Sequence, residues 1–167
     1  MGIKSYIEFE NTVRFITNAF PNAEELVKPT LLHSIRVGLY LFNDGYSREI
    51  YIAGLLHDLL EDSRVTKDEL IGKYGIEITE LVEANSKNQK LSEEEIYSDL
   101  INRCIKHSQD ALIVKVADVI DNLQYFRKLN DIERVNKMTR IGNLIIDSIP
   151  GDKYKDRIFD ELEKLLK

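Results

Sequence analysis

Residues 53–62 read Ala-Gly-Leu-Leu-His-Asp-Leu-Leu-Glu-Asp, and they are the most informative stretch of the chain. Four ionisable side chains stand within six positions of an otherwise apolar segment: His57, Asp58, Glu61 and Asp62. Burying such groups is costly unless a charged partner compensates them. The stretch therefore predicts that these side chains share a partner such as a metal ion.

The composition limits the class of protein. The chain has 167 residues, of which 31% are charged and 43% hydrophobic, which predicts one globular domain over residues 1–167. The net charge is -6 and no block of Lys or Arg stands out, so long nucleic acid is not an expected partner. A single cysteine, no signal-peptide pattern and no long apolar run predict a cytoplasmic protein without a membrane span. A homo-oligomer is compatible with the sequence.

Apolar residues at helical spacing, separated by capping and breaking residues, predict an all-α fold. β-Branched residues in the segment 111–120 also fit a strand, but polar residues recur there at helical spacing and favour a buried helix with one polar stripe. The predicted helices span about residues 5–20, 29–42, 48–60, 66–74, 76–84, 92–105, 110–125, 131–148 and 152–166.

Isolated polar residues mark three of these apolar helices: His33, the pair His57-Asp58, and Asp118. A single histidine on an apolar helix is more often a core residue than a ligand, so the prediction depends on all four side chains together. Two imidazoles and two carboxylates suit Mn, Mg, Fe, Ni or Zn, and they leave open positions on a six-coordinate ion for water and substrate. The set predicts a catalytic metal centre.

In order, spacing and helical setting, these four residues resemble the signature of the HD superfamily of metal-dependent phosphohydrolases, over roughly residues 30–126. A narrower resemblance is to the hydrolase domain of RelA/SpoT-type enzymes and their small standalone relatives, which use manganese to remove the 3′-pyrophosphate of ppGpp. The residues that carry it are Leu55 to Ser63, Tyr74-Gly75, Val116-Ala117-Asp118 and Asn122-Leu123.

The resemblance implies an all-α HD-domain helical bundle that holds one divalent ion, with Mn preferred over Mg, Fe, Ni or Zn. It implies that His33, His57, Asp58 and Asp118 bind the metal and that Glu61 with Asp62 positions or deprotonates the attacking water. It also implies that Arg36 and Asn122 line the site. Further candidates for contacts with a phosphorylated nucleotide are Lys87, Lys115 and Tyr125, and among the cations only Arg36 offers bidentate binding of phosphate.

The sequence differs from the narrower pattern at three positions. Ser34 replaces a proline after the first histidine, Ser86-Lys87 replaces a Thr-Lys pair, and Val119 replaces an arginine after the last aspartate. The predicted function is a metal-dependent phosphohydrolase acting on a small nucleotide, with removal of a ppGpp-like 3′-pyrophosphate preferred. The alternatives are an HD-type nucleotidase or phosphatase for simple nucleotides, and a non-catalytic module that binds metal and nucleotide. The pair Glu61-Asp62 disfavours the last.

Overall fold

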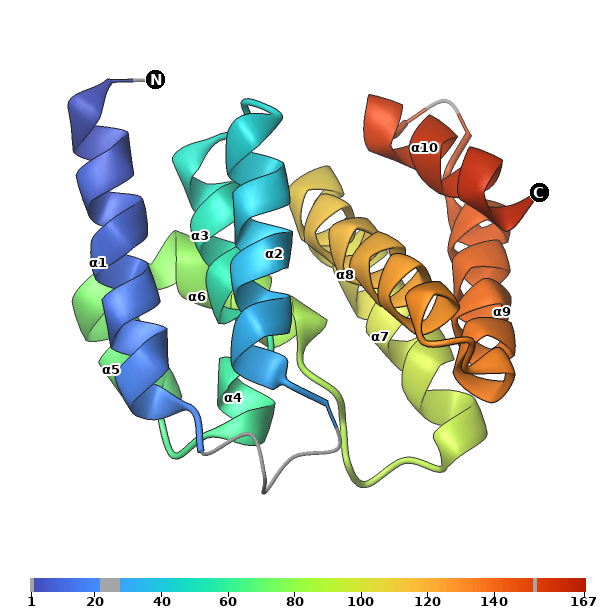
Figure 1. Ribbon diagram of the computed structural model, residues 1–167, viewed down its shortest axis with the longest axis horizontal. Coiled ribbons are helices and arrows are strands. Elements are labelled where there is room, and N and C mark those ends of the chain that lie inside the picture. The colour runs from blue at the N-terminus through green and yellow to red at the C-terminus, as the bar shows by residue number, and fades with distance from the viewer. Residues whose placement is uncertain (1, 22–27, 152) are drawn as a thin grey trace. The chain divides into compact units, whose positions relative to one another are not determined.

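The computed structural model describes residues 2–21, 28–151 and 153–167, and these residues form helices, turns and connecting segments without a strand (Figure 1). The all-α prediction is confirmed. The helices are α1 (Ile3–Ala19), α2 (Thr30–Asn43), α3 (Arg48–Leu56), α4 (Leu59–Asp62), α5 (Lys67–Tyr74), α6 (Ile76–Asn85), α7 (Glu93–His107), α8 (Gln109–Lys128), α9 (Ile132–Ser148) and α10 (Arg157–Leu166).

Local signals in the sequence set several of the helix ends. Thr66 and Ser92 each form a capping box, in which the cap hydroxyl accepts an N–H of the first turn and a glutamate accepts the cap N–H. Ser47 accepts the N–H of Ile50 at the start of α3. Gly75, with φ of 89°, ends α5 in a conformation that other residues rarely adopt.

Several helix boundaries differ from the sequence-based expectation. The helix predicted to run to Leu60 ends at Leu56, and α4 begins after a turn at His57 and Asp58. The helix predicted to start at residue 110 starts at Gln109, because the Ser108 hydroxyl caps it by accepting the Ala111 N–H at 3.1 Å. The last helix begins after Asp156, while the predicted start at Asp152 lies outside the described residues.

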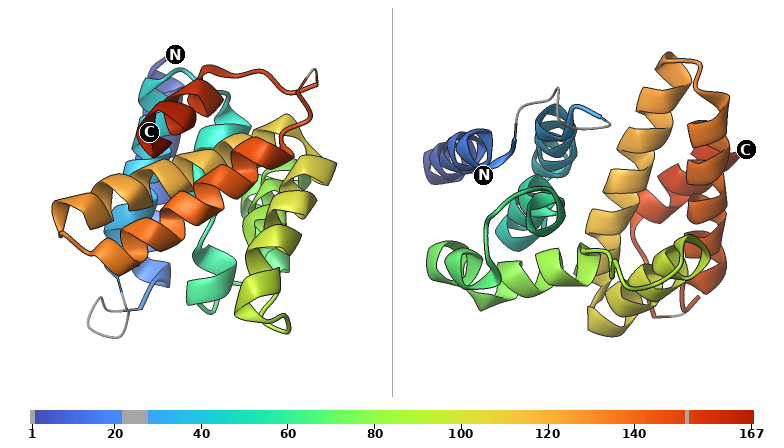
Figure 2. Two further views of the ribbon diagram at one scale, coloured as in Figure 1. Left: turned by 90° about the vertical axis from the view of Figure 1, so that its right-hand side faces the viewer. Right: turned by 90° about the horizontal axis from the view of Figure 1, so that it is seen from below.

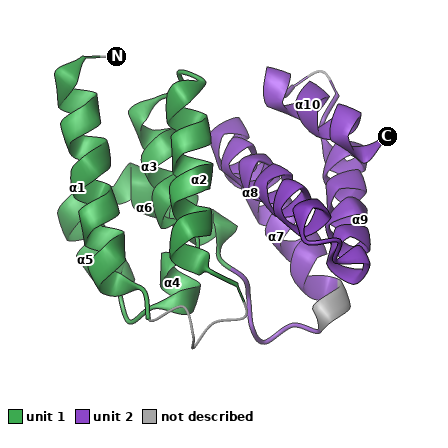
Figure 3. Cartoon of the chain, in the orientation of Figure 1, with its two compact units in different colours: residues 1–86 green, residues 87–167 purple. Residues whose placement is uncertain are grey.

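The chain divides into two compact units, residues 1–86 and 87–167 (Figure 3). The single domain over residues 1–167 therefore stays a prediction. In the first unit α3 is buried along its length from Ile50 to Leu56 and packs against α1, α2 and α6. This burial is what its nearly continuous apolar sequence predicts.

A close approach between α2 and α3 organises the first unit. Gly38 of α2 and Gly54 of α3 face each other, and a Cβ atom on Gly54 would lie 2.6 Å from Leu41 Cδ1 and 3.5 Å from Gly38 Cα. A Cβ atom on Gly38 would overlap the side chain of Leu55. The two glycines thus allow a helix separation that larger residues would prevent; α2 carries the predicted ligand His33, and α3 ends directly before His57.

In the second unit α8 packs against α7, α9 and α10, and all ten residues from Ala111 to Ile120 are buried. Figure 2 shows α8 and α9 side by side, joined by a short turn, with α10 packed on both. Cys104 on α7 is buried, and burial raises the pKa of its thiol to about 12, as is typical of a small core residue.

We predict that Gly38→Ala lowers the free energy of unfolding by about 1–3 kcal/mol, because the new methyl group overpacks the contact with Leu55. Urea denaturation followed by circular dichroism measures the change. The matched control is Gly72→Ala on α5, where a Cβ atom meets nothing within 4 Å and alanine is expected to stabilise the helix. Equal stability of Gly38→Ala and wild type would refute the close approach.

Candidate metal centre

Three of the four predicted metal ligands lie together in the first unit. His33 is on the second turn of α2, and His57 and Asp58 form the turn between α3 and α4. All three are buried, and one ligand atom from each lies within 4.8 Å of the others. The end of α3 at Leu56 thus places the His-Asp pair on a turn, with both side chains in the cluster.

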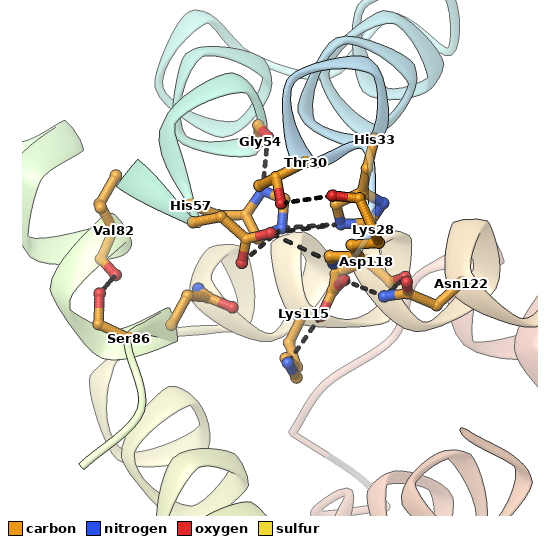
Figure 4. Close-up of polar contacts among 12 residues, drawn as sticks. Lys28, Thr30, His33, Gly54, His57, Val82, Ser86, Lys115, Asp118 and Asn122 are labelled. Atoms are coloured by element: carbon orange, nitrogen blue, oxygen red, sulfur yellow. Dashed lines mark hydrogen bonds and ion pairs between the residues drawn. The ribbon is translucent and has the colours of Figure 1, made fainter. Parts of the chain in front are cut away.

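The backbone fixes the orientation of the His57 ring. Its Nδ1 atom lies 2.8 Å from the carbonyl oxygen of Gly54 (Figure 4). A carbonyl oxygen can only accept, so Nδ1 carries the proton and donates it. In the neutral ring Nε2 then holds a lone pair, which is the tautomer that a metal ion requires.

The donor set fits one divalent ion. The Nε2 atoms of His33 and His57 lie 3.2 Å apart. Two nitrogens that bind one ion at about 2.1 Å, in adjacent positions about a right angle apart, lie about 3 Å from each other. Asp58 adds its carboxylate, with Oδ1 3.4 Å from His57 Nε2 and Oδ2 3.7 Å from His33 Nε2. Two imidazoles and a carboxylate suit Mn, Fe, Ni or Zn, which fits the predicted divalent cofactor without identifying the metal.

A lysine that the sequence did not single out adds a positive charge to this cluster. Lys28 Nζ lies 3.3 Å from Asp58 Oδ2. The Lys28 side chain is one quarter exposed, whereas that of Asp58 is one tenth exposed. The pair therefore sits at the boundary between the buried cluster and solvent. Its only sequence signal was a Lys-Pro step at the start of the helix that carries His33.

The fourth predicted ligand, Asp118, lies in the second unit on α8. Its Oδ2 atom accepts a hydrogen bond from Lys115 Nζ at 2.7 Å, and its Oδ1 atom accepts one from Asn122 Nδ2 at 2.5 Å (Figure 4). Burial disfavours the charged form of Lys115, but the adjacent Asp118 carboxylate outweighs it, and the net effect raises the pKa of the ammonium. The predicted polar stripe on α8 thus forms a hydrogen-bonded group, and metal binding by Asp118 stays a prediction.

The remaining predicted residues occupy partly exposed positions. Glu61 and Asp62 lie on α4, one turn beyond Asp58, and their backbone N–H groups donate to the Asp58 carbonyl. Arg36 follows His33 by one turn on α2, and Tyr125 lies on α8. Lys87 begins the second unit, between α6 and α7. Their partial exposure leaves their side chains accessible to a ligand, and their roles stay predictions.

A cavity of about 800 Å³ lies between α7 and α9 in the second unit. Its lining includes Tyr97 and three cations on one face of α9, Arg134, Lys137 and Arg140. The spacing of these cations by three residues was the only signal of this face in the sequence.

A family model described as HD domain matches residues 13–144. The chain therefore belongs to the HD-domain family. Three of the four residues that the sequence resemblance implied as ligands, His33, His57 and Asp58, lie in its buried cluster. The predicted class of enzyme, an HD-domain phosphohydrolase, is thus confirmed at the level of the family.

Two bacterial relatives share part of this sequence. The chain is 33% identical over 136 residues to the guanosine-3′,5′-bis(diphosphate) 3′-pyrophosphohydrolase of Spiroplasma citri. This match covers 73% of the chain and 18% of that protein. It is also 33% identical over 108 residues to the probable enzyme of the same name from Mycoplasma pneumoniae, covering 58% of the chain and 15% of that protein. The chain spans less than a fifth of the length of these relatives.

Solved structures confirm the fold. A crystal structure of a protein from Listeria monocytogenes EGD-e matches with a TM-score of 0.68 and 26% identity, covering 81% of this chain and 91% of that one. The structure of a metazoan ortholog of SpoT that hydrolyzes ppGpp matches with a TM-score of 0.72 and 21% identity, covering 99% of this chain and 95% of that one. The predicted HD fold is therefore confirmed. None of the described helices is both long and apolar enough to cross a membrane.

We predict that His57→Ala lowers the affinity for Mn²⁺ by more than about 100-fold, since removing even an outer partner of a metal ligand costs 10- to 100-fold. Isothermal titration calorimetry on the metal-stripped protein measures the loss. His107→Ala, at an exposed histidine of α7, is the matched control and should bind as wild type does. Undiminished binding by His57→Ala would show that the ion binds elsewhere.

The same titration tests the fourth ligand. We predict that Asp118→Ala lowers the Mn²⁺ affinity at least tenfold, roughly the smallest cost seen for groups that support a metal site. Asp121→Ala, one turn along the same helix, should have little effect. If Asp118→Ala binds as tightly as wild type, the protein supplies only the three ligands of the first unit.

Proposed function

We propose that this protein is a divalent-metal-dependent phosphohydrolase that removes the 3′-pyrophosphate of a ppGpp-like nucleotide. The observation that carries the proposal is the buried cluster of His33, His57 and Asp58, in which two imidazole nitrogens face each other at 3.2 Å. The relatives named as guanosine-3′,5′-bis(diphosphate) 3′-pyrophosphohydrolases support the substrate class.

The two histidines and Asp58 would hold the ion, with Asp118 as the proposed fourth ligand. A divalent ion bound there would neutralise charge on phosphoryl oxygens and lower the pKa of a bound water from 15.7 to about 7 in the best cases. The hydrogen bond from His57 to Gly54 keeps the ring in the required tautomer without any rearrangement. The fold therefore already holds the His57 ring in the orientation and tautomer that metal binding requires.

Glu61 is the proposed general base. It lies on α4, three residues after Asp58, and it is partly exposed, so its carboxylate is accessible to water. In the proposed reaction a water oxygen bonds to the phosphorus next to the ribose 3′ oxygen, and the bond to the 3′ oxygen breaks. Glu61 takes a proton of the water, with Asp62 as its coupled partner, the 3′ oxygen leaves phosphorus and takes up a proton from solvent to become a hydroxyl, and pyrophosphate that carries the water oxygen is released.

The cations supply the remaining contacts with the substrate. Arg36 can bind two phosphoryl oxygens at once, whereas Lys87 acts as a single point charge. Lys115 is occupied by Asp118, so its more direct effect is to hold that carboxylate in place. Asn122 donates a hydrogen bond to the other oxygen of the same carboxylate. Tyr125 is proposed to contact the nucleotide.

None of the three departures from the narrower pattern replaces a proposed metal ligand, and only Val119 removes a charge, that of an arginine. Ser34 and Val119 are both buried, at 0% and 1% exposure, and the Ser86 hydroxyl donates to the Val82 carbonyl at 2.9 Å. They therefore leave the proposed metal chemistry intact. A nucleotidase acting on simple nucleotides would use the same chemistry, so only a comparison of substrates separates the two.

The test is a panel in which Mn²⁺-loaded protein meets ppGpp, a nucleoside monophosphate, a nucleoside triphosphate and a generic phosphodiester. Pyrophosphate and the 5′-diphosphate released from ppGpp, at the highest kcat/KM of the panel, are the expected result. Faster turnover of a simple nucleotide would replace the proposed substrate. Full metal binding without product from any compound would contradict an enzyme for these substrates.

A substitution separates the base from the ligands. We predict that Glu61→Gln keeps the wild-type Mn²⁺ affinity but lowers kcat by about 100- to 10,000-fold, the usual contribution of a positioned general base. Glu83→Gln, an exposed glutamate of the same unit, is the control for loss of a surface charge. If Glu61→Gln loses metal as severely as His57→Ala, Glu61 is a ligand instead of the base.

A further inference from the structure

The contact between Lys28 and Asp58 has no part in the proposed reaction, yet it lies inside the proposed metal centre. Lys28 Nζ is 3.3 Å from Asp58 Oδ2, and the same oxygen is 3.7 Å from His33 Nε2. The ammonium therefore points at a carboxylate oxygen that also faces one of the imidazole ligands. A divalent ion held by His33 and Asp58 would meet this ammonium at close range.

The backbone fixes Lys28 at this position. Its carbonyl oxygen accepts the Thr30 N–H at 2.8 Å and the Thr30 hydroxyl at 3.3 Å, and Thr30 is buried. The next carbonyl, that of Pro29, accepts the N–H of His33 at 3.0 Å. The turn that starts α2 thus places both the ammonium and the first imidazole of the cluster.

Burial distinguishes this ion pair from the exposed pair of Lys67 and Glu83 in the first unit. Lys67 pairs with Glu83 at 2.7 Å, but both of those side chains are about half exposed, so solvent screens their charges. The Asp58 side chain is only one tenth exposed, and a carboxylate in such a place needs a compensating charge. Lys28 provides that charge from within the chain.

We infer that Lys28 is an internal counter-ion that competes with the divalent metal for Asp58 and so sets the metal affinity of the centre. The inference depends on the proposed metal centre but not on the identity of the substrate. Two cations near one carboxylate repel each other, and the repulsion is strong where solvent is scarce. By reciprocity, the free energy by which the ion weakens the contact of Lys28 with Asp58 equals the free energy by which that contact weakens binding of the ion.

The competition has two consequences for the protein. Asp58 stays compensated whether or not an ion is present, so folding of the turn at His57 and Asp58 does not require metal. The centre also binds its ion less tightly than its three donors alone would allow. Removing the ammonium should therefore destabilise the metal-free protein and strengthen metal binding at the same time.

The experiment compares Lys28→Met with wild type by calorimetric titration of Mn²⁺ into the metal-stripped full chain. Methionine keeps much of the apolar length of the side chain and removes its charge. The expected result is a dissociation constant for Mn²⁺ at least about fivefold lower, the low end of usual coupling between two binding events. Thermal unfolding should show a lower Tm for the metal-free variant and a larger rise in Tm on adding Mn²⁺.

Two control variants make the result specific. Lys28→Arg keeps the charge and should bind Mn²⁺ within about twofold of wild type, well short of the coupling expected from charge removal. Lys67→Met removes a lysine from an exposed pair in the same unit and should leave the dissociation constant unchanged. If Lys28→Met does not fold, Lys28→Gln removes the charge while keeping a hydrogen-bond donor, and the same fivefold change is expected of it.

Unchanged or weaker Mn²⁺ binding by the uncharged variants overturns the inference, because Lys28 would then have no effect on metal affinity or would increase it. Tighter binding by Lys28→Arg equal to that of Lys28→Met also overturns it, since charge would not be the cause. Failure of wild type to bind any divalent ion overturns the metal centre itself, and this outcome is distinct from the other two.

Discussion

The first unit depends on the close approach of α2 and α3, which is possible because glycine occupies both Gly38 and Gly54. His33 lies on one of these helices and His57 directly follows the other. Two imidazole nitrogens can face each other at 3.2 Å only if the backbones that carry them are close. A packing constraint about one and a half turns away from His33 along α2 thus underlies the geometry of the proposed metal centre.

Local chemistry made much of the fold predictable. Thr66, Ser92 and Ser47 act as caps because a hydroxyl can satisfy an N–H group in the first turn, and this depends on a few neighbouring residues. The end of α3 was less predictable. The sequence continues with good helix formers past His57, so only the packing of the whole unit decides that the helix stops at Leu56.

The candidate site shows the same division. The polar residues of α8 were recognised because Lys115, Asp118 and Asn122 recur at helical spacing, and their hydrogen bonds follow from that spacing. The sequence did not predict the contact of Lys28 with Asp58, because Asp58 is 30 residues further along the chain and no periodicity connects the two. Ion pairs between distant segments depend on tertiary structure. Local sequence patterns therefore predict the metal ligands more readily than the charged residues that surround them.

The hydrogen bond between His57 and Gly54 has one more consequence. The last carbonyl groups of any helix lack a partner within the helix, and the Gly54 carbonyl belongs to the final turn of α3. The ring of His57 donates a hydrogen bond to it, so one contact both satisfies the end of the helix and fixes the tautomer of the proposed ligand. If α3 extended by another turn, that carbonyl would accept a backbone N–H instead. The tautomer of His57 would then depend on a different hydrogen-bond partner.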